Sequence, residues 1–192
     1  MNRALTVIKL GGSHARSPGL TGWLRAITDD AGRIVVVPGG GPFADAVRDL
    51  QPVMGFDDAA AHDMALLAMT QYGRALASLA DAFVLADTLD AIEAALESRR
   101  VPVWSPWPML RDHPDIPPSW NVTSDSLALW LAQTLRAERV VLIKPQAPGA
   151  GASSESLVAR RLVDKAFPHF RERFAGVVEF AGREAVAERW HD

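Results

Sequence analysis

Two apolar, strand-like runs in this sequence end in glycine, and each leads into a helical pattern. Residues 6–10 (TVIKL) close at Gly11 and Gly12, and residues 34–37 (IVVV) lead through Pro38 into three consecutive glycines. Glycine loses more backbone freedom on folding than any other residue, so three in a row indicate a position that requires bare backbone. A strand, a glycine turn and a helix in this order are typical of an α/β unit.

The rest of the sequence continues this alternation. Further strands are expected at residues 83–85, 101–104, 139–143 and 176–180. Helices are expected at residues 19–31, 43–50, 59–80, 89–98, 124–135 and 163–174 and from Arg183 onward, with loops at 105–119 and 145–156. Such alternation indicates a parallel sheet with helices on both faces. We therefore predict an α/β fold, a three-layer αβα sandwich with a mainly parallel central sheet, built by residues 1–192 as a single domain.

Composition excludes several classes of protein. The chain is 48% hydrophobic and 22% charged with a net charge of -3, which is ordinary for a globular protein and lacks the basic face of a nucleic-acid binder. It contains no cysteine, so disulfides and thiolate chemistry are excluded. No apolar stretch is long enough for a membrane span, and the N-terminus does not resemble a signal peptide. A cytoplasmic location is expected.

The two glycine clusters predict an anion site. In an open parallel sheet, ligands bind outside the carboxyl ends of the strands, where glycine lets backbone N–H groups approach an anion closely. Neither cluster fits the P-loop pattern or the G-x-G-x-x-G fingerprint. The alternative is that the glycines only form tight turns between strands and helices.

Three charged residues have two interpretations each. Lys9 lies in an apolar run, so its ammonium either reaches water at the sheet end or stands over a transferring phosphoryl group. Asp125 falls in the first turn of a helix, where it either interacts with the helix dipole or orients groups such as Lys9 or a metal. Lys144 ends a strand, where its ammonium is either exposed to solvent or part of a functional site. His62 and Tyr72 are interpreted as packing or surface residues, and no histidine spacing predicts a structural metal.

Four motifs, taken together, resemble the amino acid kinase family. These are IKLGGS near the start, VVVPGGGPFADAVR, WNVTSDSLALWLA and VVLIK. Their order and spacing match over about 150 residues. The resemblance implies a phosphotransferase (kinase) with ATP and Mg²⁺ as cofactors, and a phosphoryl group that moves between the two glycine clusters.

The resemblance also implies residue roles. Lys9 and Asp125 would be catalytic, with Asp125 orienting the lysine. The ATP side would be formed by Gly11, Gly12, Ser13 and Lys144. The acceptor substrate would be bound by Gly39, Gly40, Gly41 and Asn121. No residue is expected to form a metal site of its own. Residues 1–135 would form the acceptor-side part and residues 136–192 a shortened nucleotide-side part.

The segment AAAHDMALLAMTQYGRALASL narrows the resemblance to the [5-(aminomethyl)furan-3-yl]methyl phosphate kinase branch, which serves methanofuran-type C1-carrier biosynthesis. An aromatic acceptor would suit Trp104, Trp107 or Trp120 as a stacking face. Residues 145–149 read PQAPG where the family has an Asp-x-Asp-Gly run, and this favours the alternative of a non-catalytic nucleotide- or anion-binding subunit. A kinase for another acceptor, a carboxylate or an isoprenoid phosphate, is a further alternative. A small-molecule substrate and a homodimer, or a hetero-oligomer with a related subunit, are the expected partners. No nucleic acid or membrane is expected.

Overall fold

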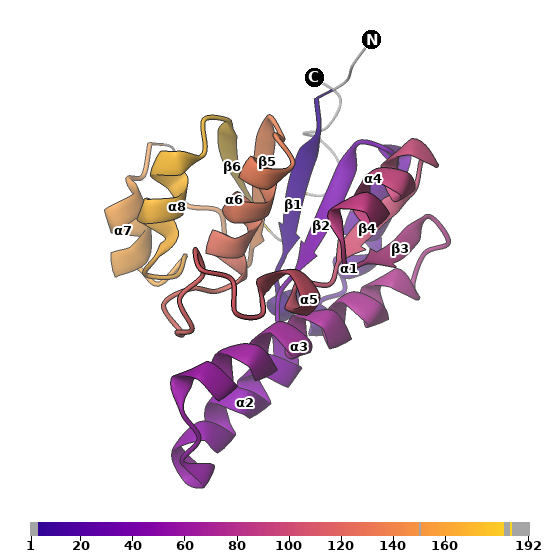
Figure 1. The fold of residues 1–192 in the computed structure, drawn as a ribbon. Coiled ribbons are helices and arrows are strands. Elements are labelled where there is room, and N and C mark those ends of the chain that lie inside the picture. The colour runs from indigo at the N-terminus through magenta and orange to yellow at the C-terminus, as the bar shows by residue number, and fades with distance from the viewer. Residues whose placement is uncertain (1–3, 150, 183–184, 186–192) are drawn as a thin grey trace.

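A computed structural model describes residues 4–149, 151–182 and 185, and its centre is a six-stranded parallel sheet (Figure 1). The strand order is β3-β4-β2-β1-β5-β6. The strands are β1 (Thr6–Leu10), β2 (Ile34–Pro38), β3 (Phe83–Ala86), β4 (Val101–Trp104), β5 (Arg139–Lys144) and β6 (Val177–Gly182). The predicted α/β fold with a parallel sheet is confirmed.

Strand β1 lies in the middle of the sheet, between β2 and β5. Its Ile8 is in register with Val36 on one side and Val141 on the other. All five residues of β1 are buried, as expected for a strand covered on both faces. Because these strands are parallel, the ends of β1, β2 and β5 meet at one edge.

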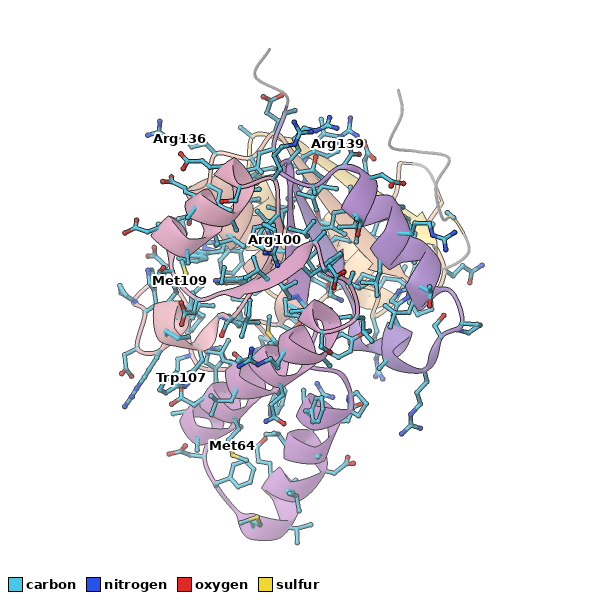
Figure 2. All side chains as sticks on the ribbon, turned by 90° about the vertical axis from the view of Figure 1, so that its right-hand side faces the viewer. Met64, Arg100, Trp107, Met109, Arg136 and Arg139 are labelled. Atoms are coloured by element: carbon cyan, nitrogen blue, oxygen red, sulfur yellow. The ribbon has the colours of Figure 1, made fainter. Side chains whose placement is uncertain are left out.

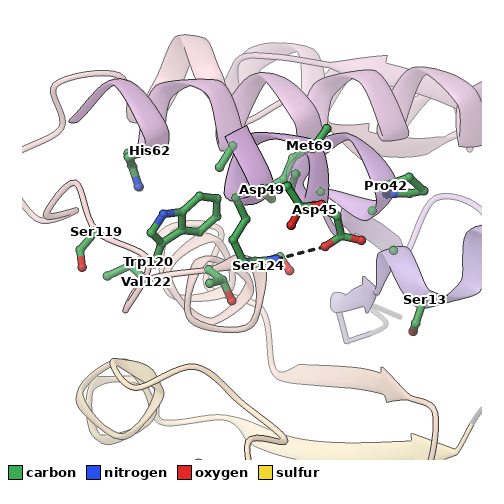
Figure 3. A pocket seen from close by; sticks show the side chains of 18 of the residues that line it. Ser13, Pro42, Asp45, Asp49, His62, Met69, Ser119, Trp120, Val122 and Ser124 are labelled. Atoms are coloured by element: carbon green, nitrogen blue, oxygen red, sulfur yellow. Dashed lines mark hydrogen bonds and ion pairs between the residues drawn. The ribbon is translucent and has the colours of Figure 1, made fainter. Parts of the chain in front are cut away.

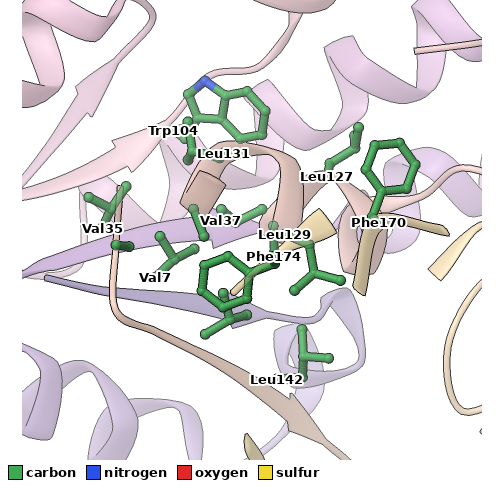
Figure 4. Close-up of a cluster of buried hydrophobic side chains, with 14 of the residues drawn as sticks. Val7, Val35, Val37, Trp104, Leu127, Leu129, Leu131, Leu142, Phe170 and Phe174 are labelled. Atoms are coloured by element: carbon green, nitrogen blue, oxygen red, sulfur yellow. The ribbon is translucent and has the colours of Figure 1, made fainter. Parts of the chain in front are cut away.

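Helices cover both faces of the sheet. The helices are α1 (Leu20–Asp29), α2 (Gly41–Met54), α3 (Asp58–Ala77), α4 (Leu89–Glu97), α5 (Trp107–Leu110), α6 (Ser124–Thr134), α7 (Ser154–Ala159) and α8 (Phe167–Arg173), with a 3₁₀ turn, η1, at Gly12–Arg16. Val7 and Leu142 pack with α6 and α8 in one core cluster (Figure 4), whereas Ile8 and Val141 pack with α1 in the other. This alternation along each strand produces the three layers.

Helices α2 and α3 form a hairpin that projects from the sheet (Figure 1). Helix α2 ends at Gly55, whose φ of 75° is left-handed, and α3 starts after Asp57, whose carboxylate accepts a hydrogen bond from Ala60 N at 2.8 Å. Figure 2 shows Met64 on this hairpin, at the opposite end of the molecule from Arg139. None of the helices in the described ranges is long and apolar enough to cross a membrane.

Helix α2 is longer than the helix predicted at 43–50, and further helix boundaries differ from the sequence predictions in the second half of the chain. Helix α7 begins inside the expected loop at 145–156, because the Ser153 side chain accepts a hydrogen bond from Ser156 N and caps it. The helix predicted at 163–174 is only the shorter α8, and the loop at 105–119 contains α5. The helix predicted from Arg183 lies outside the described residues.

Candidate active site

Two lysines and an aspartate meet inside the protein at the carboxyl ends of β1 and β5. Lys9 Nζ lies 3.0 Å from Asp125 Oδ1, and Lys144 Nζ lies 2.6 Å from Asp125 Oδ2. The three residues are only 7%, 6% and 6% exposed. Two of the three lysines in the chain are thus buried against one carboxylate. With both lysines protonated, the cluster carries a net positive charge.

The fold explains how these residues meet. Lys9 and Lys144 point to the face that α6 covers, because they alternate with Ile8 and Ile143, which belong to the opposite core. Asp125 is the second residue of α6 and lies above the two strand ends. Lys144 is therefore not solvated, and Lys9 does not reach water at the sheet end.

The cluster shifts the ionisation of its members. Burial alone would raise the pKa of Asp125, but the charges of Lys9 and Lys144 and their hydrogen bonds outweigh burial and hold it below its usual value. Burial, together with repulsion from Lys9, lowers the pKa of Lys144 to about 8, although Asp125 acts in the opposite direction. Lys144 therefore loses its proton at a lower pH than an ordinary lysine does.

The glycine turns pack directly against each other. A Cβ atom on Gly12 would stand 2.0 Å from Gly41 Cα, and one on Gly39 would stand 2.6 Å from Gly12 N. Gly41 also has a φ of 56°, in the left-handed region. This close approach is one reason why the chain requires bare backbone here. Helix α2 starts at this contact, and no side chain caps its N-terminus.

A cavity of about 670 Å³ opens beside the glycine turns (Figure 3). Its walls come from η1, α2, α3 and the segment before α6. The polar and aromatic lining includes Ser13, Arg16, Asp45, Arg48, Asp49, His62, Ser119, Trp120, Thr123 and Ser124. Ser124 directly precedes Asp125, so the buried cluster lies immediately behind this wall.

Trp120 is held in the cavity wall by two side chains of α2. Its Nε1 donates a hydrogen bond to Gln51 Oε1 at 2.6 Å. The Arg48 guanidinium lies 4.5 Å from the centre of the Trp120 ring and forms an ion pair with Asp45 at 3.0 Å. The indole face is therefore part of an ordered polar and aromatic surface.

The predicted site residues fall into four groups. Gly12, Ser13, Gly40 and Gly41 line the cavity, and Lys9, Asp125 and Lys144 form the cluster behind it. Gly11 lies under the Lys9 ammonium, since a Cβ there would be 3.1 Å from Lys9 Nζ. Gly39 and Asn121 do not line the cavity, and Asn121 is exposed. The assigned roles of all these residues stay predictions.

Sequence reasoning missed several lining residues. His62, interpreted as packing or surface, lines the cavity, and burial lowers its pKa against opposing effects of Asp63 and the Ser119 backbone. Arg16 and Asp49 carried no pattern that distinguished them. Trp104 is fully buried and stacks on Trp130 with ring centres 5.9 Å apart, so it belongs to the core and not to the cavity.

A second cavity, of about 450 Å³, lies beside the segment that follows Lys144. It is lined by residues of this segment, α7, α8 and β6, including Ala147, Pro148, Phe167, Arg171 and Phe180. Within the described ranges, no group of three or more His, Asp or Glu residues is placed to hold a metal ion.

Comparisons with known proteins show the family and the fold of the chain. Residues 4–146 match the sequence profile of the amino acid kinase family. The [5-(aminomethyl)furan-3-yl]methyl phosphate kinase of Methanocaldococcus jannaschii is 27% identical over 139 residues, which are 71% of this chain and 63% of that protein. The match thus spans less than two thirds of this curated relative.

Two crystal structures share the fold. Uridylate kinase from Archaeoglobus fulgidus has a TM-score of 0.69 at 17% identity, over 93% of this chain and 90% of that one. UMP kinase from Ureaplasma parvum has a TM-score of 0.67 at 15% identity, over 94% and 90%. Since the family profile covers most of the sequence, the chain belongs to the amino acid kinase family.

Proposed function

We propose that this protein is an ATP-dependent small-molecule kinase that transfers the γ-phosphoryl group to a phosphomonoester. The observation that carries this proposal is the buried cluster of Lys9, Asp125 and Lys144 beside a cavity that contains a helix N-terminus. Phosphoryl transfer requires little covalent chemistry from a protein, and it is accelerated mainly by positioning and by positive charge on the transferring group. A pre-formed pair of ammonium groups supplies that charge.

The reaction would proceed by direct displacement. An oxygen of the acceptor phosphate forms a bond to the γ-phosphorus, and the bond from that phosphorus to the β,γ-bridging oxygen breaks. ADP leaves with the electron pair, and the acceptor becomes a diphosphate. A phosphomonoester dianion has no proton to lose, so the site needs no general base. Asp125 would instead keep the side chains of Lys9 and Lys144 in place.

The second cavity is the proposed ATP side. Aromatic and apolar side chains such as Phe167 and Phe180 could contact the base, and Lys144 stands at the end of the adjacent strand β5. In this assignment, residues 136–192 form the nucleotide-side part and residues 1–135 the acceptor-side part of one domain. Mg²⁺ would be held by the ATP phosphates themselves, because the described residues offer no carboxylate cluster for it.

The first cavity is the proposed acceptor site. Arg16 and the uncapped N-terminus of α2 suit the phosphate of the acceptor, since backbone N–H groups and the helix dipole favour anions. The lining also includes Trp120, which offers a ring face, and Asp49 of α2, which offers a carboxylate. These features favour an acceptor with a flat ring and an amine, such as [5-(aminomethyl)furan-3-yl]methyl phosphate, in methanofuran- or methylofuran-type C1-carrier biosynthesis. The curated relative of that name supports this choice.

A turnover assay tests the proposal. We expect ADP release from ATP and Mg²⁺ with [5-(aminomethyl)furan-3-yl]methyl phosphate, and a diphosphate product visible by ³¹P NMR. Lys9→Ala should abolish turnover, whereas Lys165→Ala is the matched control because Lys165, the third lysine, is exposed. Carboxylates and isopentenyl phosphate serve as alternative acceptors. A folded protein that turns over none of them would refute the proposal.

A second candidate is a non-catalytic subunit that binds a nucleotide or another anion. The observation that favours it is the segment 145–149, which is largely exposed and carries no carboxylate toward the nucleotide side. Calorimetry separates the two candidates. A binding subunit would bind ATP without turnover or would bind no nucleotide, whereas the kinase must bind ATP and consume it.

We also propose that the protein forms a homodimer through the α2–α3 hairpin, or a hetero-oligomer with a related subunit. Large apolar side chains are exposed along this hairpin, most of all Val53 at 79% and Met54 at 70%. Phe43 and Leu50 on α2 and Leu67 on α3 are also exposed, at 42%, 45% and 40%. Apolar groups gathered at the end of a projecting element favour burial against another chain.

A further inference from the structure

We propose that Asp164 is a positioning residue that fixes the start of α6 and thereby holds Asp125 between the two lysines. The kinetic part of this proposal rests on the kinase function proposed above, and the structural part does not. Asp164 lies in the segment between α7 and α8, 38 residues after Ser126, which it contacts at the start of α6.

A single carboxylate makes four hydrogen bonds to the first turn of α6. Asp164 Oδ2 accepts from Thr123 N at 3.0 Å, from Thr123 Oγ1 at 2.9 Å and from Ser126 N at 3.1 Å, and Oδ1 accepts from Ser126 Oγ. The first N–H groups of a helix have no partner within the helix. Thr123, the N-cap residue, makes no cap hydrogen bond of its own. Asp164 therefore takes over the capping of α6 from a distant part of the chain.

A second contact secures the same turn. Ala166 N donates to the carbonyl oxygen of Asn121 at 2.9 Å. The segment 164–166 thus holds the chain on both sides of Asp125, at Asn121 and Thr123 before it and at Ser126 after it. A misplacement of about 1 Å can lower a rate by about 100-fold. Hydrogen bonds on both sides of Asp125 therefore suit a carboxylate that must contact two ammonium groups at once.

The charge of Asp164 also acts on the cluster. Burial, together with the charge of Asp125, raises the pKa of Asp164, and hydrogen bonds from Ser126 and Thr123 oppose the rise. Asp164 in turn favours the protonated form of Lys144, which is faced by Lys9, Asp125 and Asp164. Removal of this negative charge should therefore lower the pKa of Lys144 below about 8.

Two substitutions separate the cap from the charge. In Asp164→Asn, the amide oxygen can still accept the hydrogen bonds of Thr123 and Ser126 N, and the Ser126 hydroxyl can reverse to accept from the amide nitrogen. The cap is kept and the charge is lost. In Asp164→Ala, both the cap and the charge are lost, and two backbone N–H groups are left without partners. Lys165→Gln, at the neighbouring exposed residue, is the control.

The decisive readout is the titration of Lys144 by NMR of isotope-labelled lysine, which requires no turnover. With three lysines in the chain, the signals are assignable from Lys165→Gln and from Lys144→Arg. We expect Asp164→Asn to fold and to lower the pKa of Lys144. We also expect kcat to fall about 10-fold in Asp164→Asn and about 100-fold in Asp164→Ala, with KM values within about twofold of the wild type.

A folded Asp164→Ala variant with the Lys144 titration and the kcat of Asp164→Asn would overturn the proposal, because loss of the cap would then have no effect beyond loss of the charge. If Asp164→Ala does not fold, Asp164→Glu takes its place, since it keeps the charge and moves the carboxylate by one methylene group, and an unchanged Lys144 titration and kcat there overturn the proposal. If the wild-type protein has no kinase activity while the Lys144 titration in Asp164→Ala differs from that in Asp164→Asn, the proposed function fails and the positioning of the cluster by Asp164 stands.

Discussion

Lys144 directs its ammonium nitrogen to within 2.6 Å of Asp125 Oδ2 in the interior of the protein. The same carboxylate contacts Lys9, so one negative charge serves two buried positive charges. Removal of a partner from a buried pair is costly because the remaining charge is desolvated and unpaired. The contact therefore links the stability of the protein to the machinery of the proposed reaction.

Asp125→Asn keeps the shape of the side chain and removes its charge. We expect the free energy of unfolding to fall by about 3–5 kcal/mol and turnover to fall at least about 100-fold. Urea denaturation and steady-state kinetics measure the two effects. Asp81→Asn, at an exposed position, should change stability by less than about 0.5 kcal/mol. A stable, fully active Asp125→Asn variant would contradict the assignment.

The lowered pKa of Lys144 leads us to expect a pH dependence of both activity and stability. Because its pKa in the folded protein is about 8, the ammonium is lost above that pH and kcat/KM should decline. Between about pH 8 and 10.5 the unfolded chain holds a proton that the folded chain lacks, so this residue makes stability rise with pH in that window. Lys144→Arg stays protonated and should show lower but flat activity from pH 7 to 10. Parallel declines in both proteins would assign the titration to another group.

Much of the fold could be predicted from the sequence, because the strands are short apolar runs with clear ends. The meeting of Lys144 with Asp125 could not, since it depends on the order of strands in the sheet, which places β5 beside β1. The capping of α6 by Asp164 could not be predicted from the sequence either, because the two segments are distant along the chain. The position of His62 in the cavity wall could not be predicted either, because burial in such a wall leaves no local sequence pattern.

Gly12→Ala tests the contact between the two glycine turns. The added methyl group would stand 2.0 Å from Gly41 Cα, so backbone must shift, and we expect a loss of about 1–3 kcal/mol or more together with loss of turnover. Thermal denaturation measures the stability change. Gly149→Ala is the matched control for stability, because a methyl group there meets no atom within 4 Å.

Trp120→Ala tests the acceptor cavity. Loss of the ring face should raise the KM for the acceptor about 10-fold and leave the KM for ATP unchanged, because the residue lies only in the first cavity. Trp120→Phe keeps a ring but loses the hydrogen bond to Gln51 and should be intermediate. Trp107→Phe, outside the cavity, is the control. An equal rise in both KM values would place the acceptor elsewhere.

The hairpin surface predicts the oligomeric state. Val53→Asp combined with Met54→Asp should convert a dimer into a monomer in sedimentation velocity, because two charges would have to be buried in the interface. Leu79→Asp, at a 58% exposed residue after the end of α3, should leave the dimer intact. A wild-type protein that is monomeric at all concentrations would exclude the proposed interface.

The backbone contact of Gly12 with Gly41 has a mechanical consequence. No side chain separates the two turns, so a change in the backbone of one turn must also displace the other. Because both turns line the first cavity, an anion bound to the backbone of one turn would also restrain the other, without any large movement of the sheet.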